Sequence, residues 1–215
     1  IYELGLQVFN DSVMAHFDQE WYTRFYGTPP AEQFRIIIGF TNGPCNYGPS
    51  RKLTGQPKEV FAIMNYAVDD NERPIFYKKV VETVVHEFCH SFTKIKGDTE
   101  KALEKSGKAL QEYTYFSMRR QAYSTWRNIL EESLVRAATI CYLIDHDYDE
   151  KDIRNAIIEQ VDRNFFWMPE LVQTLRYYES HRKKYPTFTS FYPEIIRFFD
   201  RYVADVEKEI QKALK

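Results

Sequence analysis

The feature that most constrains the fold is an apolar pattern with the period of an α-helix around residues 77–95. With about 100° between successive residues, the apolar side chains fill one half of this helix: Tyr77, Val80, Val81, Val84, Val85, Phe88, Cys89, Phe92 and Ile95. His86 and His90 lie near the middle of the other half. Such a helix buries its apolar half against other elements. The pattern therefore predicts a packed domain in which the two histidines stay on the accessible side.

Residues 86–90 also spell the pattern HExxH. Residues four apart lie one above the other on a helix face, so His86 and His90 can both bind one tetrahedral Zn²⁺ ion. Glu87 then lies beside the metal, where its carboxylate can accept a proton from an activated water as the general base. The alternative, two packing or surface histidines, is disfavoured because apolar residues already fill the buried half. Cys89 points into that half and is not expected as a ligand.

A catalytic zinc needs a third protein ligand and one open position. In the metzincin pattern, a glycine and a histidine follow the second motif histidine by three and six residues. In this chain those positions hold Thr93 and Lys96, which excludes that class. We therefore expect a glutamate from a later helix.

Three glutamates are candidates for the third ligand: Glu112, Glu131 and Glu132. Glu112 lies in an amphipathic stretch, so its alternative is a solvated surface carboxylate. The other two lie in a stretch that is apolar nearly all round, which predicts a buried helix. There Glu131 could instead pair with Arg127, and Glu132 with Arg136, each four residues away.

Two segments carry a resemblance to a known family: HEFCHSF at residues 86–92, and LEESLVRA at residues 130–137, after Trp126. Together they resemble a bacterial domain-of-unknown-function family of proposed gluzincin-type zinc metallopeptidases. The resemblance covers roughly residues 60–144. It implies that Glu132, the glutamate of the ExLVRA pattern, is the third zinc ligand. It also implies an extracytoplasmic location.

The rest of the chain predicts an α+β architecture around the motif. Residues 34–40 and 60–68 are rich in β-branched and aromatic residues and are expected as strands, joined by a turn-rich loop. Helices are expected at residues 74–96, 99–120, 125–144, 150–166, 169–184 and 193–214. We expect a single metallopeptidase-like catalytic domain over residues 1–215 with a zincin-like fold, in which a small N-terminal sheet precedes the HExxH helix and a mainly helical C-terminal half. Residues 60–68 are expected at the sheet edge, where an extended peptide could add as a strand.

Composition limits the partners and the compartment. A net charge of −2 argues against nucleic acid or an anionic membrane as a partner. No apolar run reaches the length of about 18 residues that a membrane-spanning helix needs. The three cysteines form neither a CxxC pair nor an even framework, so buried free thiols are expected. The chain opens at Ile1 without a basic and apolar leader, so any targeting segment is expected to be absent.

These features predict a zinc-dependent hydrolase, most specifically a metallopeptidase that cleaves a peptide or protein substrate. His86, His90 and Glu132 are its expected metal ligands and Glu87 is its expected general base. The alternatives are a non-catalytic module that retains zinc and a zinc hydrolase that acts on a non-peptide bond. A group that stabilises the oxyanion is also needed, and its candidates are Tyr123, Tyr178, Tyr185 and His181.

Overall fold

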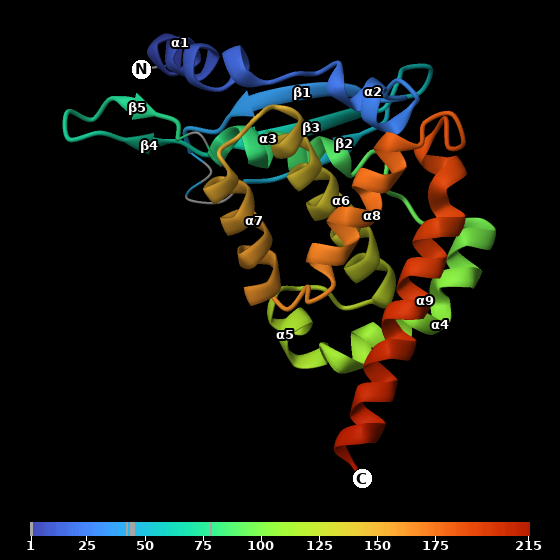
Figure 1. Ribbon diagram of the computed structural model, residues 1–215. Coiled ribbons are helices and arrows are strands. Elements are labelled where there is room, and N and C mark those ends of the chain that lie inside the picture. Colours follow the sequence, from blue (N-terminus) through green and yellow to red (C-terminus); the bar gives the residue numbers. More distant parts are fainter. Residues whose placement is uncertain (1, 42, 44–45, 78) are drawn as a thin grey trace. The chain divides into compact units, whose positions relative to one another are not determined.

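The protein has a mixed α+β fold, shown in Figure 1 as a computed structural model that describes residues 2–41, 43, 46–77 and 79–215. The chain divides into two compact units. Unit 1 comprises Ile1–Arg24 and Thr28–Phe92, and unit 2 comprises Phe25–Gly27 and Thr93–Lys215. The sheets belong to unit 1, whereas unit 2 is helical. The two units are described separately below.

A three-stranded sheet with the order β1-β3-β2 is the centre of unit 1. Strand β1 (Gln33–Ile38) runs parallel to β3 (Glu59–Met64), and the short β2 (Ser50–Arg51) runs antiparallel to β3. Upstream of β2, Tyr47 continues this pairing through an antiparallel bridge to Ile63. The expected strand at residues 34–40 is thus confirmed in its main part. The expected edge position of β3 is wrong, because β3 has a partner on each side.

The segment expected as one strand at residues 60–68 divides after Met64. Its end forms β4 (Ala67–Val68), which pairs with β5 (Pro74–Ile75) in a two-stranded hairpin. The Asp69 carboxylate closes the connecting turn by accepting bonds from the backbone N–H groups of Asn71 and Arg73, both at 2.9 Å. Pro74 and Ile75 are therefore strand residues, and the expected helix start at Pro74 is wrong.

Helix α3 (Lys79–Cys89) carries the HExxH motif and packs on β3. Its apolar face is buried as predicted, with Val81, Val84 and Val85 fully inaccessible. Tyr77, which was expected on the same face, lies before the helix and is 64% exposed. The Phe88 ring stacks on Phe34 of β1 with 4.1 Å between centroids. The Tyr22 hydroxyl donates to the Val85 carbonyl at 3.2 Å. These contacts fix the helix on the sheet and leave the motif histidines on its other face.

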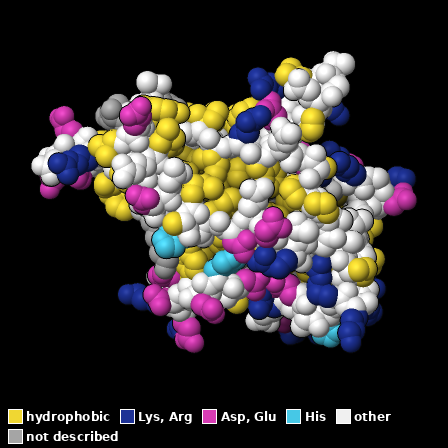
Figure 2. All heavy atoms as spheres, turned by 90° about the horizontal axis from the view of Figure 1, so that it is seen from above, with side chains coloured by type: hydrophobic (Ala, Val, Ile, Leu, Met, Phe, Trp, Pro, Cys, Tyr) yellow, Lys and Arg dark blue, Asp and Glu magenta, His cyan; other side chains and the backbone are white. Residues whose placement is uncertain are grey.

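The remaining helices of unit 1 were not predicted: α1 (Tyr2–Ser12), the 3₁₀ turn η1 (Met14–His16) and the start of α2 (Trp21–Tyr26). Apolar side chains gather on the face of the molecule that carries α1 and β1 (Figure 2). Within unit 1, a cavity of about 280 Å³ is lined mainly by aromatic and aliphatic side chains, among them Phe9, Met14, Phe17, Phe34, Ile36 and Phe88.

Unit 2 is a helical assembly in which α6 packs against α4, α7 and α8, and α9 packs against α4 and α8 (Figure 1). Its helices are α4 (Gly97–Tyr113), α5 (Tyr115–Arg120), α6 (Trp126–Asp145), α7 (Glu150–Asp162), α8 (Met168–Ser180) and α9 (Phe188–Ala213). Most of α6 is buried, as its sequence predicted, and the Thr125 side chain caps its start by accepting from the Asn128 N–H.

Several helix boundaries in unit 2 differ from the prediction. Helices α7 and α8 end at Asp162 and Ser180, before the expected residues 166 and 184. The segment expected as one helix at residues 99–120 is two helices with a break at Thr114. Helix α9 begins before the expected Pro193, because Thr187 and Ser190 form a capping box there and Pro193 lies inside the helix.

The buried thiols and the membrane prediction agree with the structure where it can test them. Cys89 and Cys141 are buried and form no disulfide, as expected, whereas Cys45 lies outside the described residues. No helix in the described part of the chain is long and apolar enough to cross a membrane.

Candidate metal centre

The two motif histidines lie close together, His86 on the face of α3 opposite its buried residues and His90 directly after the end of the helix. Their ring centroids are 5.1 Å apart, with the ring planes inclined by 83°. Helix α3 ends at Cys89, so His90 lies in the turn that follows it. The Ser91 N–H donates to the Phe88 carbonyl at 3.1 Å, and the Phe92 N–H donates to the Cys89 carbonyl at 3.0 Å. These two bonds form the turn that contains His90. Both imidazoles are half-buried, as suits ligands that must be ordered and still reachable.

Glu87 lies between the histidines in sequence and is also half-buried. Its carboxylate lies against the backbone of Gly48, in the segment that leads into β2. A Cβ atom on Gly48 would be closer than 3.0 Å to Glu87 Oε2 and 3.2 Å from its Cδ. The Glu87 side chain therefore lies between helix α3 and this segment, and both limit the space that it can occupy.

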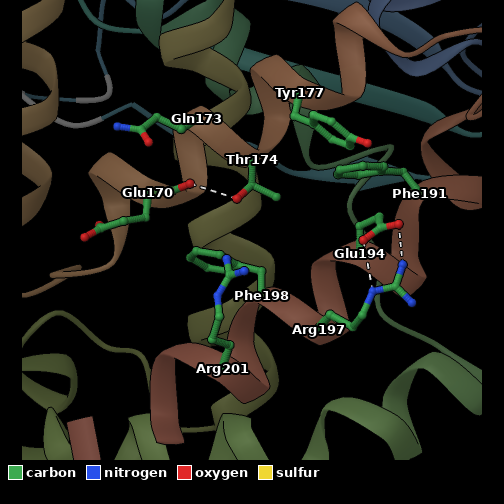
Figure 3. A pocket seen from close by; sticks show the side chains of 9 residues that line it. All are labelled: Glu170, Gln173, Thr174, Tyr177, Phe191, Glu194, Arg197, Phe198 and Arg201. Carbon is green, nitrogen blue, oxygen red and sulfur yellow. Dashed lines mark hydrogen bonds and ion pairs between the residues drawn. The ribbon is translucent and has the colours of Figure 1, made fainter. Parts of the chain in front are cut away.

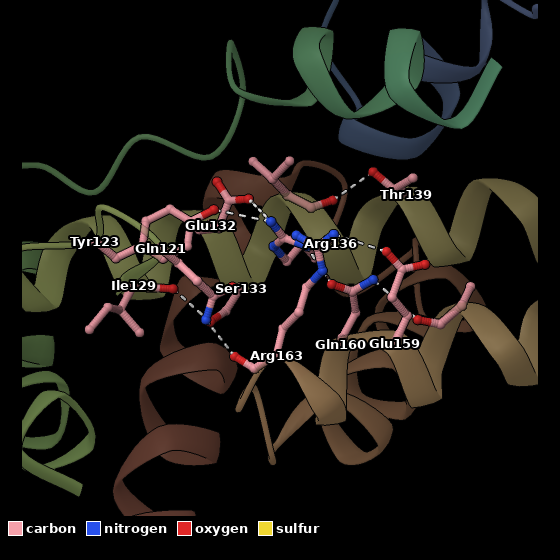
Figure 4. A network of polar contacts seen from close by, with 12 residues as sticks. Gln121, Tyr123, Ile129, Glu132, Ser133, Arg136, Thr139, Glu159, Gln160 and Arg163 are labelled. Carbon is pink, nitrogen blue, oxygen red and sulfur yellow. Dashed lines mark hydrogen bonds and ion pairs between the residues drawn. The ribbon is translucent and has the colours of Figure 1, made fainter. Parts of the chain in front are cut away.

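Glu132 lies on α6 in unit 2, where only 6% of the residue is exposed. Its carboxylate forms an ion pair with Arg136 one turn later, with Oε1 2.7 Å from Nη2. Arg136 also donates to Gln160 Oε1 at 2.5 Å and to the Tyr123 hydroxyl at 3.0 Å (Figure 4). Its guanidinium lies over the Phe165 ring, 5.0 Å from the centroid. The predicted alternative for Glu132, pairing with Arg136, is thus present.

This network compensates the Glu132 carboxylate, which would lower the stability of the fold if it were buried without a partner. A buried charge needs a partner of opposite sign and further hydrogen bonds to that partner. Arg136 provides the charge, and Tyr123, Gln160 and Phe165 hold Arg136 in place. Burial raises the pKa of the Tyr123 phenol, so this hydroxyl stays protonated at neutral pH. An ordered carboxylate of this kind can also serve as a metal ligand, since such ligands are commonly braced by neighbouring groups.

The other two glutamate candidates have different surroundings. Glu131 Oε1 accepts from the Ile95 N–H at 2.9 Å, and its Oε2 accepts from Lys94 Nζ at 3.1 Å. The expected partner of Glu131, Arg127, pairs with Glu100 instead. Glu112 is exposed, as its solvated alternative predicted. Among the three, only Glu132 is buried.

Of the four candidates for oxyanion stabilisation, only Tyr123 belongs to the Glu132 network. Tyr178 is fully buried, and burial raises its pKa to about 12. Tyr185 donates to Glu194, and the His181 ring lies 2.9 Å from the Tyr177 carbonyl. These three residues lie around the end of α8 and the start of α9.

Unit 2 also contains a groove of about 410 Å³ between α8 and α9 (Figure 3). Phe191 and Phe198 line its apolar part, and Arg197 is paired with Glu194 at its side. None of the predicted site residues lines this groove.

Sequence reasoning missed two features of these sites. The contact of Gly48 with Glu87 had no signal in sequence, because the two residues lie on different elements and the loop pattern predicted only turns. The bond from Arg136 to Gln160 likewise joins two helices. By contrast, the Glu132–Arg136 pair was visible from its helical spacing.

The comparisons with known proteins give a family whose description states no function. No curated protein matches the chain, and no solved structure does. One family model matches residues 2–198, and its description is "Domain of unknown function (DUF4932)". Since this match spans nearly the whole sequence, including α3 and α6, the chain belongs to the DUF4932 family.

Proposed function

We propose that this protein is a zinc-dependent hydrolase with a zincin-like fold, in which His86, His90 and Glu132 bind the metal and Glu87 is the general base. Two imidazoles and one carboxylate are a donor set that could hold a metal ion, and it is the set found in one class of catalytic zinc sites. The observation that carries the proposal is the pairing of His86, on the accessible face of α3, with His90 in the turn that follows, while Glu87 is the next residue after His86.

When bound, the metal supplies Lewis-acid activation of a water molecule. The chain supplies the proton transfers. Glu87 accepts the proton that the water loses on attacking the carbonyl carbon, and it then donates that proton to the leaving amine. Arg136 is paired with the Glu132 carboxylate and holds it in place. Peptide or protein substrates suit this chemistry best, and the resemblance in the motif segments favours an extracytoplasmic place of action.

A non-catalytic zinc module is the rival proposal. Metal retention alone does not require a carboxylate beside the two histidines, so the presence of Glu87 favours the enzyme. A hydrolase of a non-peptide bond would use the same residues and would differ only in substrate.

The test combines metal analysis with hydrolysis assays. Purified wild-type protein should contain one zinc ion per chain, and His86→Ala and His90→Ala should lose it. Glu87→Gln should retain zinc and lose hydrolysis by on the order of 10² to 10⁴ in rate, as measured on a broad peptide mixture. Absence of bound zinc, with no uptake of added zinc, would refute the site. Zinc binding without cleavage of any peptide would favour the rival module or a non-peptide substrate.

A further inference from the structure

Gly48 lies in a segment whose backbone is fixed by hydrogen bonds to the central strand β3. The Tyr47 N–H donates to the Ile63 carbonyl at 3.0 Å, and the Ile63 N–H donates back at 2.8 Å. After Gly48, the Phe61 N–H donates to the Pro49 carbonyl at 2.9 Å. Bonds on both sides of Gly48 therefore prevent this segment from moving away without breaking its pairing with β3.

The backbone conformation does not explain why residue 48 is a glycine. Four other glycines have positive φ angles, which side chains rarely adopt, but Gly48 is not among them. What excludes a side chain at this position is space. A Cβ atom would meet the Glu87 carboxylate, with Oε2, Cδ and Cγ as its three nearest atoms.

An added methyl group therefore has to be accommodated by Glu87. The segment is bonded to β3, and α3 is packed on the sheet through Phe88, so neither backbone yields easily. The end of the Glu87 side chain is the flexible part and would rotate away. A glycine at position 48 is what allows the carboxylate to occupy its present place.

We propose that Gly48 is a positioning residue for Glu87, which keeps the carboxylate in the orientation that a general base needs. The inference rests on the proposed function for the role of Glu87, but the contact itself does not depend on metal or substrate. Misplacement of a reacting group by about 1 Å can cost on the order of 10²-fold in rate. A single methyl group at Gly48 should thus act on the reaction without touching His86 or His90.

The decisive variant is Gly48→Ala, with Ser50→Ala as the matched control on the same segment. Crystal structures should show the Glu87 carboxylate rotated in Gly48→Ala and unmoved in Ser50→Ala. Zinc content should equal that of the wild type in both. On a cleaved peptide, Gly48→Ala should lower kcat by on the order of 10²-fold with KM little changed, because a general base acts in the chemical step. An unmoved carboxylate, or a kcat equal to that of the wild type, would overturn the proposal.

A double variant keeps the test decisive if Gly48→Ala fails to fold. In the Glu87→Ala background the carboxylate is absent, so Gly48→Ala should fold there. Folding of the double variant alone supports the contact, whereas failure of both overturns it. If the wild type binds no zinc and cleaves nothing, the proposed function fails. The structures of the variants would then still show whether Gly48 positions Glu87.

Discussion

Glu131 and Glu132 are neighbours in sequence, yet their carboxylates have different partners. Glu131 accepts from Lys94 and from the Ile95 N–H, whereas Glu132 is buried against Arg136. We predict that Glu132→Ala severely weakens zinc affinity and that Glu131→Ala leaves it nearly unchanged, because only a coordinating oxygen brings a fixed charge to the metal. Competition with a chelator measures both affinities. If Glu131→Ala alone loses zinc, the third ligand is Glu131 and not Glu132.

Arg136 is predicted to stabilise the metal-free protein. Arg136→Ala leaves the Glu132 carboxylate buried without its cation, which should lower the free energy of unfolding by roughly 3 to 5 kcal/mol. Arg163→Ala is the matched control, because Arg163 also pairs with a glutamate one turn away but its side chain is 47% exposed. The control should cost about 1 kcal/mol or less. Denaturant unfolding in the presence of a chelator compares the two variants, and equal losses would refute a special role for Arg136.

At the scale of elements, a glycine sets the approach of α4 to α6. A Cβ atom on Gly107 would lie 2.5 Å from Trp126 Cε3 and 3.2 Å from Leu130 Cδ1. Glycine-to-alanine changes usually stabilise a helix by up to about 1 kcal/mol. Gly107→Ala should instead destabilise unit 2, by roughly 1 to 3 kcal/mol from overpacking. The free energy of unfolding, measured for the wild type and for Gly107→Ala, shows whether the change stabilises or destabilises the protein. A more stable variant would show that α4 and α6 can move apart with little loss of stability.

Helices α6 and α8 are joined by a charge cluster that predicts a pH dependence. Arg176 of α8 pairs with Asp145 of α6, and with Glu179 at 2.6 Å. Burial, together with the nearby Asp145, raises the pKa of Glu179 from 4.5 to about 8. A carboxyl group with a raised pKa binds its proton more tightly in the folded state. Its contribution to stability is therefore complete below about pH 4.5 and is lost as the pH rises through about 8.

The variant Glu179→Gln tests this directly, because an amide imitates the protonated carboxyl group without titrating. The wild type should lose stability between about pH 5 and pH 8, and the variant should lose less over the same range. Unfolding free energies measured at several pH values give the two slopes. Parallel curves would show that Glu179 is ionised throughout.

Elements with a clear apolar pattern were predictable from sequence. The buried face of α3, the strand β1 and the buried helix α6 follow from this pattern alone. The errors lie where tertiary contacts or side-chain bonds decide. Asp69 closes a hairpin turn that takes Pro74 out of the expected helix, and the pairing of β3 on both sides depends on strands distant in sequence.

The candidate site divides in the same way. His86, Glu87 and His90 were evident because their spacing is local to one helix. The assignment of Glu132 as a metal ligand depended on a family resemblance, whereas its ion pair with Arg136 was predictable from their spacing of four residues. The contacts of Gln160 with Arg136 and of Gly48 with Glu87 join separate elements, and no local pattern in a single sequence encodes such contacts.

At the scale of the whole molecule, a bound metal ion should stabilise the folded protein. A ligand that binds only the folded state stabilises it by about 4.1 kcal/mol when its free concentration is a thousand times the dissociation constant. Zinc removal should therefore lower the Tm of the wild type and increase hydrogen exchange in both units. Glu132→Ala should respond much less to a chelator. A loss of protection confined to unit 1 would indicate that Glu132 is not a ligand.

Among the described residues, two cysteine thiols are fully buried, Cys89 on α3 in unit 1 and Cys141 on α6 in unit 2. A thiol reacts with an alkylating reagent only when the reagent can reach its thiolate. With Cys45 replaced by serine, the labelling rate of each remaining cysteine would report how often its own part of the structure opens under native conditions. Cys89 and Cys141 thus serve as two natural probes of how fast the structure around them opens. Equal labelling rates that change together when zinc is added would mean that the two units open as one cooperative body.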